Sequence, residues 1–279
     1  MSITRRHWTD SSGTPTTGTP LDDAELQTVY DTLDARWYRL STTLTGSQND
    51  LVITASSLEA DLILCNNATD LTITGIAAPT NPAKPGKKLV IVSGGAGNVY
   101  LKHQSASSNA ANRLINLATS LDTPLAAGVG VAIYVYDDAN SRWRLIAHDQ
   151  GAAITYTPTW TNGTLGNGTL SANYLLRGRT VSVRFSLTWG STTSSSGVWS
   201  FSLPGTGVAG TPFAGAFNAF SQDASAGGTV YPSLGFMNST TTLQFMSLDA
   251  VPATQIATTA PFTWATSDVL NAAGQYQVT

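Results

Sequence analysis

Charged side chains are scarce in this sequence of 279 residues: Asp, Glu, Lys and Arg make up 11% of it, against about 25% in typical soluble domains. After residue 150 only three basic and three acidic side chains occur. So few charges are typical of a surface that lies against other subunits, because charges are depleted at the cores of obligate interfaces. The net charge of -3 leaves no basic excess for a phosphate backbone, so no nucleic-acid partner is expected.

Cysteine is almost absent. The single Cys65 excludes an intramolecular disulfide and any zinc site built from paired cysteines. It follows the apolar residues Leu62, Ile63 and Leu64, and a free cysteine in such a setting usually behaves as a small hydrophobe. We therefore predict a buried, inert thiol, and we expect neither a metal nor a cofactor.

Catalytic side chains are few as well. The chain has three histidines and only two glutamates, and it contains no Gly-x-Ser-x-Gly elbow, His-Glu-x-x-His helix or Gly-Lys-Ser/Thr phosphate loop. We therefore do not expect an enzyme. A polysaccharide hydrolase with paired carboxylates would depend on aspartates such as Asp223, Asp249 and Asp268, and this stays open as a third alternative.

Long apolar runs are also missing. No stretch of about 20 apolar residues exists, and no apolar segment follows Arg5 and Arg6, so we expect neither membrane insertion nor an export signal.

The first 40 residues combine a polar leader with a predicted helix. Residues 9–20 are turn formers that a partner would have to order. Asp22 with Glu25 forms a capping box at the start of a helix over residues 21–40. Its apolar side chains follow coiled-coil spacing: Leu26, Tyr30, Leu33, Trp37 and Leu40. A helix of about 19 residues is marginal alone, so this stripe either associates with copies of itself or packs on its own chain.

The remaining residues predict a mainly β protein with two domains, 41–150 and 155–279, joined by a linker at 151–154. β-Branched and aromatic runs separated by turn residues predict strands at 51–54, 62–64, 71–74, 88–92, 99–101 and 131–136. A hairpin turn at 137–141 is predicted to join the last of these to a strand at 142–146. In the second domain, apolar and polar residues alternate over 179–189 and 242–248, which predicts long strands, and a Ser- and Gly-rich loop is expected at 190–197. Regular strands with frequent turns favour a β-sandwich or jelly roll there.

Tryptophans concentrate in this second, charge-poor domain, at Trp160, Trp189, Trp199 and Trp264. A flat indole offers an apolar face to a sugar ring, so these side chains are candidates for contact with a host surface. Packing in the core or at a subunit interface is the alternative.

The N-terminal leader resembles that of many phage and prophage structural proteins. The resemblance is carried by Arg5-Arg6-His7-Trp8-Thr9-Asp10, Gly13-Thr14, Thr16-Thr17-Gly18-Thr19, Ala24-Glu25-Leu26-Gln27 and Tyr30-Asp31. It implies that residues 1–20 attach the chain to a virion, with Trp8, Thr9 and Asp10 as the attachment residues.

Two further resemblances cover the rest of the chain. Small β-modules of phage tail and head fibres are similar to Asn109-Ala110-Ala111-Asn112-Arg113, Leu125, Gly128, Tyr136-Asp137 and Arg142-Trp143-Arg144. A phage-associated C-terminal sandwich is similar to Tyr156-Thr157-Pro158-Thr159-Trp160, Gly166-Asn167-Gly168-Thr169-Leu170, Tyr174, Arg177-Gly178-Arg179-Thr180-Val181 and Trp199-Ser200-Phe201-Ser202-Leu203-Pro204.

Such families are commonly trimeric and carry no catalytic residues. The resemblance implies a virion protein made in the bacterial cytoplasm: a homotrimeric tail fibre that binds a host glycan or protein. A capsid (head) fibre or decoration protein is the alternative.

Overall fold

The computed structural model describes residue 44 and residues 47–53, 62–79, 87–208, 215–249 and 252–279. Strands dominate these residues, which contain no α-helix and a single 3₁₀ turn at Ala110–Asn112. The prediction of a mainly β protein is therefore confirmed. The predicted helix at 21–40, with its stripe of apolar side chains, and the leader with Trp8, Thr9 and Asp10 lie outside the described residues and stay predictions.

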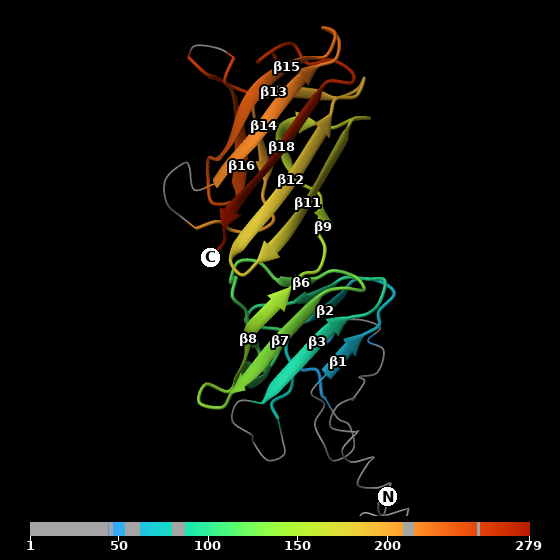
Figure 1. Ribbon diagram of the computed structural model, residues 1–279, viewed down its shortest axis with the longest axis vertical. Helices are drawn as coiled ribbons and strands as arrows, with labels where there is room; N and C mark the ends of the chain where they lie inside the picture. Colours follow the sequence, from blue (N-terminus) through green and yellow to red (C-terminus); the bar gives the residue numbers. More distant parts are fainter. Residues whose placement is uncertain (1–43, 45–46, 54–61, 80–86, 209–214, 250–251) are drawn as a thin grey trace, which may run out of the picture. The chain divides into compact units, whose positions relative to one another are not determined.

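The first half of the described chain forms two small sheets (Figure 1). One sheet has the strand order β1-β3-β7-β8-β5 and the other β2-β4-β6. Their bounds are β1 Leu62–Cys65, β2 Leu71–Ile73, β3 Lys88–Ser93, β4 Val99–Leu101, β5 Leu114–Ile115, β6 Thr123–Leu125, β7 Val131–Asp137 and β8 Arg142–Asp149. Alternate side chains of β1, β3 and β7 are buried, as the period of two in a strand requires.

The hydrophobic core of this half includes Ile63, Cys65, Leu89, Ile91, Tyr134 and Trp143. Cys65 has no exposed surface, which confirms its predicted burial, and this burial raises the pKa of its thiol to about 12. The predicted strands reappear as β1 to β4, β7 and β8, except that the described residues of the predicted strand 51–54 form only an isolated bridge, at Leu51.

The turn predicted between β7 and β8 is also present. Asp137 accepts hydrogen bonds from the backbone N–H and the side-chain amide of Asn140, and it pairs with Arg144 across the hairpin. The hydrogen bond from Arg144, followed by the one from the Asn140 side chain, lowers the pKa of the Asp137 carboxyl.

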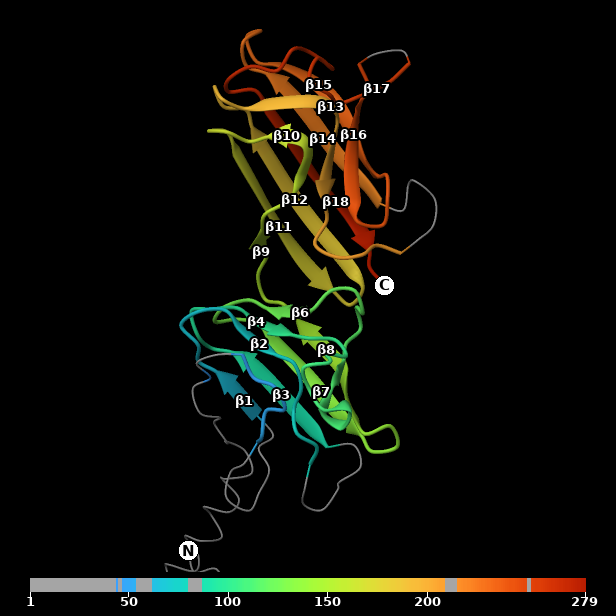
Figure 2. The ribbon, with the colours of Figure 1, turned by 180° about the vertical axis from the view of Figure 1, so that it is seen from behind.

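The second half forms one large antiparallel sheet, with the strand order β10-β13-β16-β15-β14-β18-β12-β11-β9 and β17 beside β16 (Figure 2). The bounds are β9 Ile154–Tyr156, β10 Trp160–Thr164, β11 Thr169–Arg177, β12 Thr180–Thr188, β13 Ser194–Ser202, β14 Gly215–Asp223, β15 Thr229–Met237, β16 Thr242–Ser247, β17 Thr254–Gln255 and β18 Val269–Gln277.

This sheet curves over its own core. Phe185 on β12 contacts Phe201 on β13 and Phe245 on β16, at ring-centre distances of 4.6 and 5.8 Å, although several strands separate them in the sheet order. The two ends of a single curved sheet therefore enclose the hydrophobic core that two separate sheets would enclose in a sandwich.

Two boundaries differ from the sequence prediction. Residues 190–197 were expected to be a loop, but β13 already begins at Ser194 because it pairs with Thr164 of β10. Ile154, expected in the linker, is the buried first residue of β9. In both places pairing with distant residues overrides the local preference of Ser and Gly for turns.

Contacts within the unit Leu40–Thr279 cross the predicted linker. Ala118 and Ala126 belong to the hydrophobic cluster of the large sheet. The buried side chain of Gln150 donates to the carbonyl oxygen of Tyr174, at 3.0 Å, and accepts from the N–H of Leu176, at 2.7 Å. The Gln150 amide thus supplies hydrogen-bond partners to backbone groups of β11 at the point where the pairing of β11 with β9 ends.

Candidate functional site

Three of the four candidate tryptophans are core residues. Trp189, Trp199 and Trp264 have relative exposures of 7%, 0% and 6%. Their rings contact one another, with centres 5.5 Å apart for Trp189 and Trp199 and 4.6 Å apart for Trp199 and Trp264. Because these rings already face one another inside the fold, the expectation that they contact a host surface is wrong, and the packing alternative holds.

Trp160 is half-buried and packs against the same aromatic cluster. Its ring lies edge-on to Trp199, with centres 5.0 Å apart, and stacks on Phe201 at 5.7 Å. Gly163 lies against the indole, where a Cβ would collide with the ring. Both packing partners are apolar, so Trp160 also contributes to the core, while its partial exposure leaves host-surface contact at this residue a prediction.

Two of the three candidate aspartates have structural partners. Asp268 is fully buried, and its carboxylate oxygens accept the N–H groups of Ala224, at 2.8 Å, and Ala265, at 2.5 Å. Asp223 accepts from the hydroxyl of Ser225 and the N–H of Ala226. Asp249 is exposed. Over the described ranges, no three His, Cys, Asp or Glu side chains gather as a metal site would require.

The motif Asn109-Ala110-Ala111-Asn112-Arg113, which carries a resemblance, is also structural. Asp50 accepts hydrogen bonds from the backbone and side-chain N–H groups of Asn109 and from the side chain of Asn112. The side-chain amide oxygen Oδ1 of Asn112 in turn accepts the N–H of Ala78. These bonds tie three separate chain segments together, so the motif holds a loop in place.

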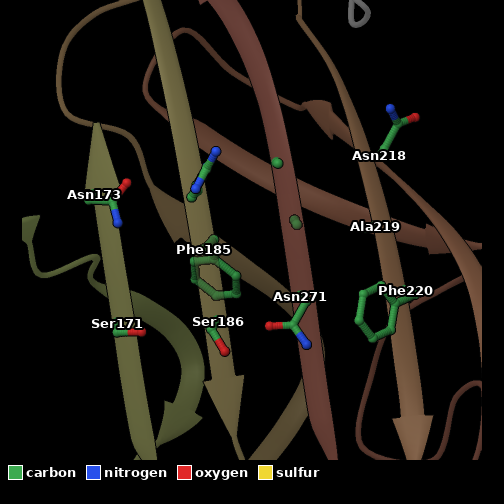
Figure 3. A pocket seen from close by; sticks show the side chains of 11 residues that line it. Ser171, Asn173, Phe185, Ser186, Asn218, Ala219, Phe220 and Asn271 are labelled. Atoms are coloured by element: carbon green, nitrogen blue, oxygen red, sulfur yellow. The ribbon is translucent and has the colours of Figure 1, made fainter. Parts of the chain in front are cut away.

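A hollow lies on the outer face of the large sheet, opposite the core (Figure 3). Its volume is about 490 Å³, and it crosses strands β11, β12, β18 and β14. A second hollow of about 880 Å³ continues along β11, β12 and β18 and shares Asn173, Arg184 and Ala273 with the first. We call the two together the outer groove.

Strand register places the lining side chains in two rows. One row runs Ser171, Ser186, Asn271, Phe220, and the next runs Asn173, Arg184, Ala273, Asn218. Figure 3 shows Asn271 between Ser186 and Phe220.

The groove combines three kinds of recognition chemistry. Side-chain amides and hydroxyls offer hydrogen bonds, Phe220 is 40% exposed, and Arg184 and Arg177 supply positive charge. No acidic side chain lines either hollow. Such a surface can bind a polar ligand through hydrogen bonds, ring contact and charge, but it contains no nucleophile paired with a base.

Sequence reasoning missed this groove, although one signal was present. In the alternating run 179–189, Arg184 lies out of phase with the apolar positions, which places its charge on the face opposite the core. Phe220 had no comparable signal, because only the pairing of β14 with β18 brings it beside Asn271.

Two histidines are partly buried and titrate below their ordinary value. Desolvation, the largest cause for both, lowers the pKa of His103 and of His148, whose ring also bonds the Pro124 carbonyl oxygen. Each histidine therefore binds a proton more readily in the unfolded chain than in the folded one. The stability that the two neutral histidines contribute is complete above their unfolded pKa of 6.5, and it is lost as the pH falls through their lower pKa in the folded protein.

We expect the unfolding midpoint to fall between pH 7.5 and pH 5, and to fall less in His148→Gln. Thermal scans at matched ionic strength and protein concentration measure this difference. An equal fall in both proteins would contradict the role of His148.

No described helix is long and apolar enough to cross a membrane. A comparison with protein-family models and with curated proteins found no match to this chain.

Proposed function

We propose that this chain is a structural subunit of a bacteriophage particle, namely a homotrimeric tail fibre that contacts the host surface as a receptor-binding protein. The observation that carries the proposal is the outer groove: an open, shallow face with Phe220, amides and arginines in a segment otherwise almost free of charge. An open face of this kind suits adhesion to an extended surface polymer better than it suits an enclosed reaction site.

Each segment of the chain has its own role in this function. Residues 1–20 attach to other virion proteins through Trp8, Thr9 and Asp10, and residues 21–40 form the short oligomerisation helix. Residues 41–150 form a shaft or shoulder, and residues 155–279 form a sandwich-type tip that displays the groove. Three copies would present three grooves, and avidity can exceed single-site affinity by about 10²–10⁴.

The adhesion role predicts competition. Purified full-length protein added to host cells should reduce adsorption of the phage, whereas Phe220→Ala should compete at least about tenfold less well, because it removes the exposed ring from each copy. Counting unadsorbed phage against competitor concentration measures this. Equal competition by both proteins would show that the outer groove does not contact the host surface. No competition by either protein would contradict the adhesion role.

The helix predicts the oligomeric state. Light scattering should give a trimer for the wild type and a monomer for Leu33→Asp, because a carboxylate at a central stripe position would be buried between helices. Thr43→Asp adds the same charge outside the stripe and serves as the control. A monodisperse monomer in both wild type and Leu33→Asp would contradict the coiled-coil argument.

The second candidate is a capsid fibre or decoration protein. The same leader resemblance and the scarcity of charge support it equally. The two candidates differ in where the chain attaches on the particle.

A further inference from the structure

We propose that the outer groove binds an acidic glycan, with Arg184 and Arg177 pairing with its carboxylate or phosphate groups and Phe220 packing against a sugar ring. This inference names a ligand class for the receptor-binding role and rests on that proposed function for its biological setting. The binding itself can be tested without a phage.

Charge complementarity selects an acidic ligand. The groove contains two exposed arginines and no acidic side chain. Among the described residues, the ion pairs join Lys102 to Asp122 and Arg144 to Asp137, so neither groove arginine has a carboxylate partner there. A guanidinium group presents paired N–H donors that match the two oxygens of a carboxylate or phosphate.

Two of the three acidic side chains after residue 150 already have partners within the fold, and the third, Asp249, forms no ion pair with either groove arginine. Asp268 and Asp223 are buried, and their carboxylates accept hydrogen bonds from turn residues, as described above. A ligand anion is therefore the charge partner that the groove lacks.

Strand spacing selects an oligosaccharide over a single sugar. Arg184 on β12 and Phe220 on β14 are separated by β18, so two strand spacings, roughly 10 Å, lie between their backbones. Arg177 lies four residues beyond Asn173 on β11, which is roughly 13 Å along the strand. One ligand that touches all three side chains must span several sugar units.

The rest of the lining suits sugar hydroxyls. Asn173, Asn271 and Asn218 each carry an amide that can both donate and accept a hydrogen bond, and Asn271 lies next to Phe220 in the register row. An exposed ring beside amides can receive the apolar face of a pyranose while the amides bond its hydroxyls.

Titration calorimetry on the full-length protein tests this with three probes: an oligogalacturonate, its fully methyl-esterified form and a phosphodiester-linked hexose oligomer. We expect one or both acidic probes to bind, and the neutral ester to bind at least about tenfold more weakly, because it cannot form charge-assisted hydrogen bonds to the two guanidinium groups. The stronger acidic probe identifies carboxylate or phosphate as the preferred group.

Single variants locate the site. Arg184→Gln and Phe220→Ala should each weaken binding of the preferred probe by about tenfold or more. Arg144→Gln removes the same charge from the β7–β8 hairpin, outside the groove, and should leave the affinity unchanged. Because Arg184 and Phe220 are exposed, the unfolding midpoints of their variants should match that of the wild type.

Several results would overturn the proposal. They are equal affinity for acid and ester, no binding of either acidic probe, and unchanged affinity in Arg184→Gln. A change of oligomeric mass in Arg184→Gln would instead make the groove a subunit interface. If the probes bind as expected but the protein is absent from virions, the proposed function fails while the glycan site stands.

Discussion

Replacing Trp199 with alanine should destabilise the protein by about 3–5 kcal/mol, the loss typical of removing a fully buried indole. Trp199 has no exposed surface, and its ring contacts Trp160, Trp189 and Trp264. The cavity would leave three rings without their shared partner. For a chain of this size the melting temperature should fall by roughly 10 °C.

Chemical unfolding at fixed protein concentration measures this loss. Trp199→Phe keeps a ring at the site and should lose much less, and Phe220→Ala, on the exposed face, should change the free energy of unfolding by less than about 1 kcal/mol. An unchanged midpoint for Trp199→Ala would mean that the aromatic cluster does not hold the fold together, and it would return Trp199 to the set of ligand-contact candidates.

Replacing Asp268 with alanine should lower the free energy of unfolding by about 2–6 kcal/mol. The carboxylate accepts the N–H groups of Ala224 and Ala265, and each donor left buried without an acceptor costs about 1–3 kcal/mol. Asp268→Asn retains one acceptor oxygen and should lose about half as much. Asp249→Asn alters an exposed side chain and is the matched control.

The same variants decide the hydrolase alternative. Unfolding curves and an assay for polysaccharide cleavage are run on the same preparations. Loss of stability without any cleavage by the wild type supports a structural Asp268. Cleavage by the wild type that Asp268→Asn abolishes at unchanged stability would instead make the chain a depolymerising tailspike.

Local pattern in the sequence predicted strands well where the alternation was regular. Within 179–189, Val181, Val183, Phe185 and Leu187 alternate with polar residues and are buried. Trp189 continues the same phase, so the period of two already placed it inside. Trp199, Phe201 and Leu203 share a phase in the same way, so the alternation also places Trp199 on the buried face.

The groove could not be predicted in the same way because it depends on long-range pairing. Ser186, Asn271 and Phe220 lie in one row only after β12 and β14 pair with β18, and no local feature of the sequence specifies those partners. The early start of β13 has the same cause. Ser194 and Ser195 favour turns locally but are held in a strand by β10.

Immunogold labelling of purified phage particles, with an antibody against the full-length protein, tests most directly whether this chain is a tail fibre. Label is expected on the tail, at its host-facing end. Label distributed over the capsid would replace the tail fibre with a head fibre or decoration protein. Particles without label, from a stock in which the protein is produced, would contradict the claim that this chain is part of a virion.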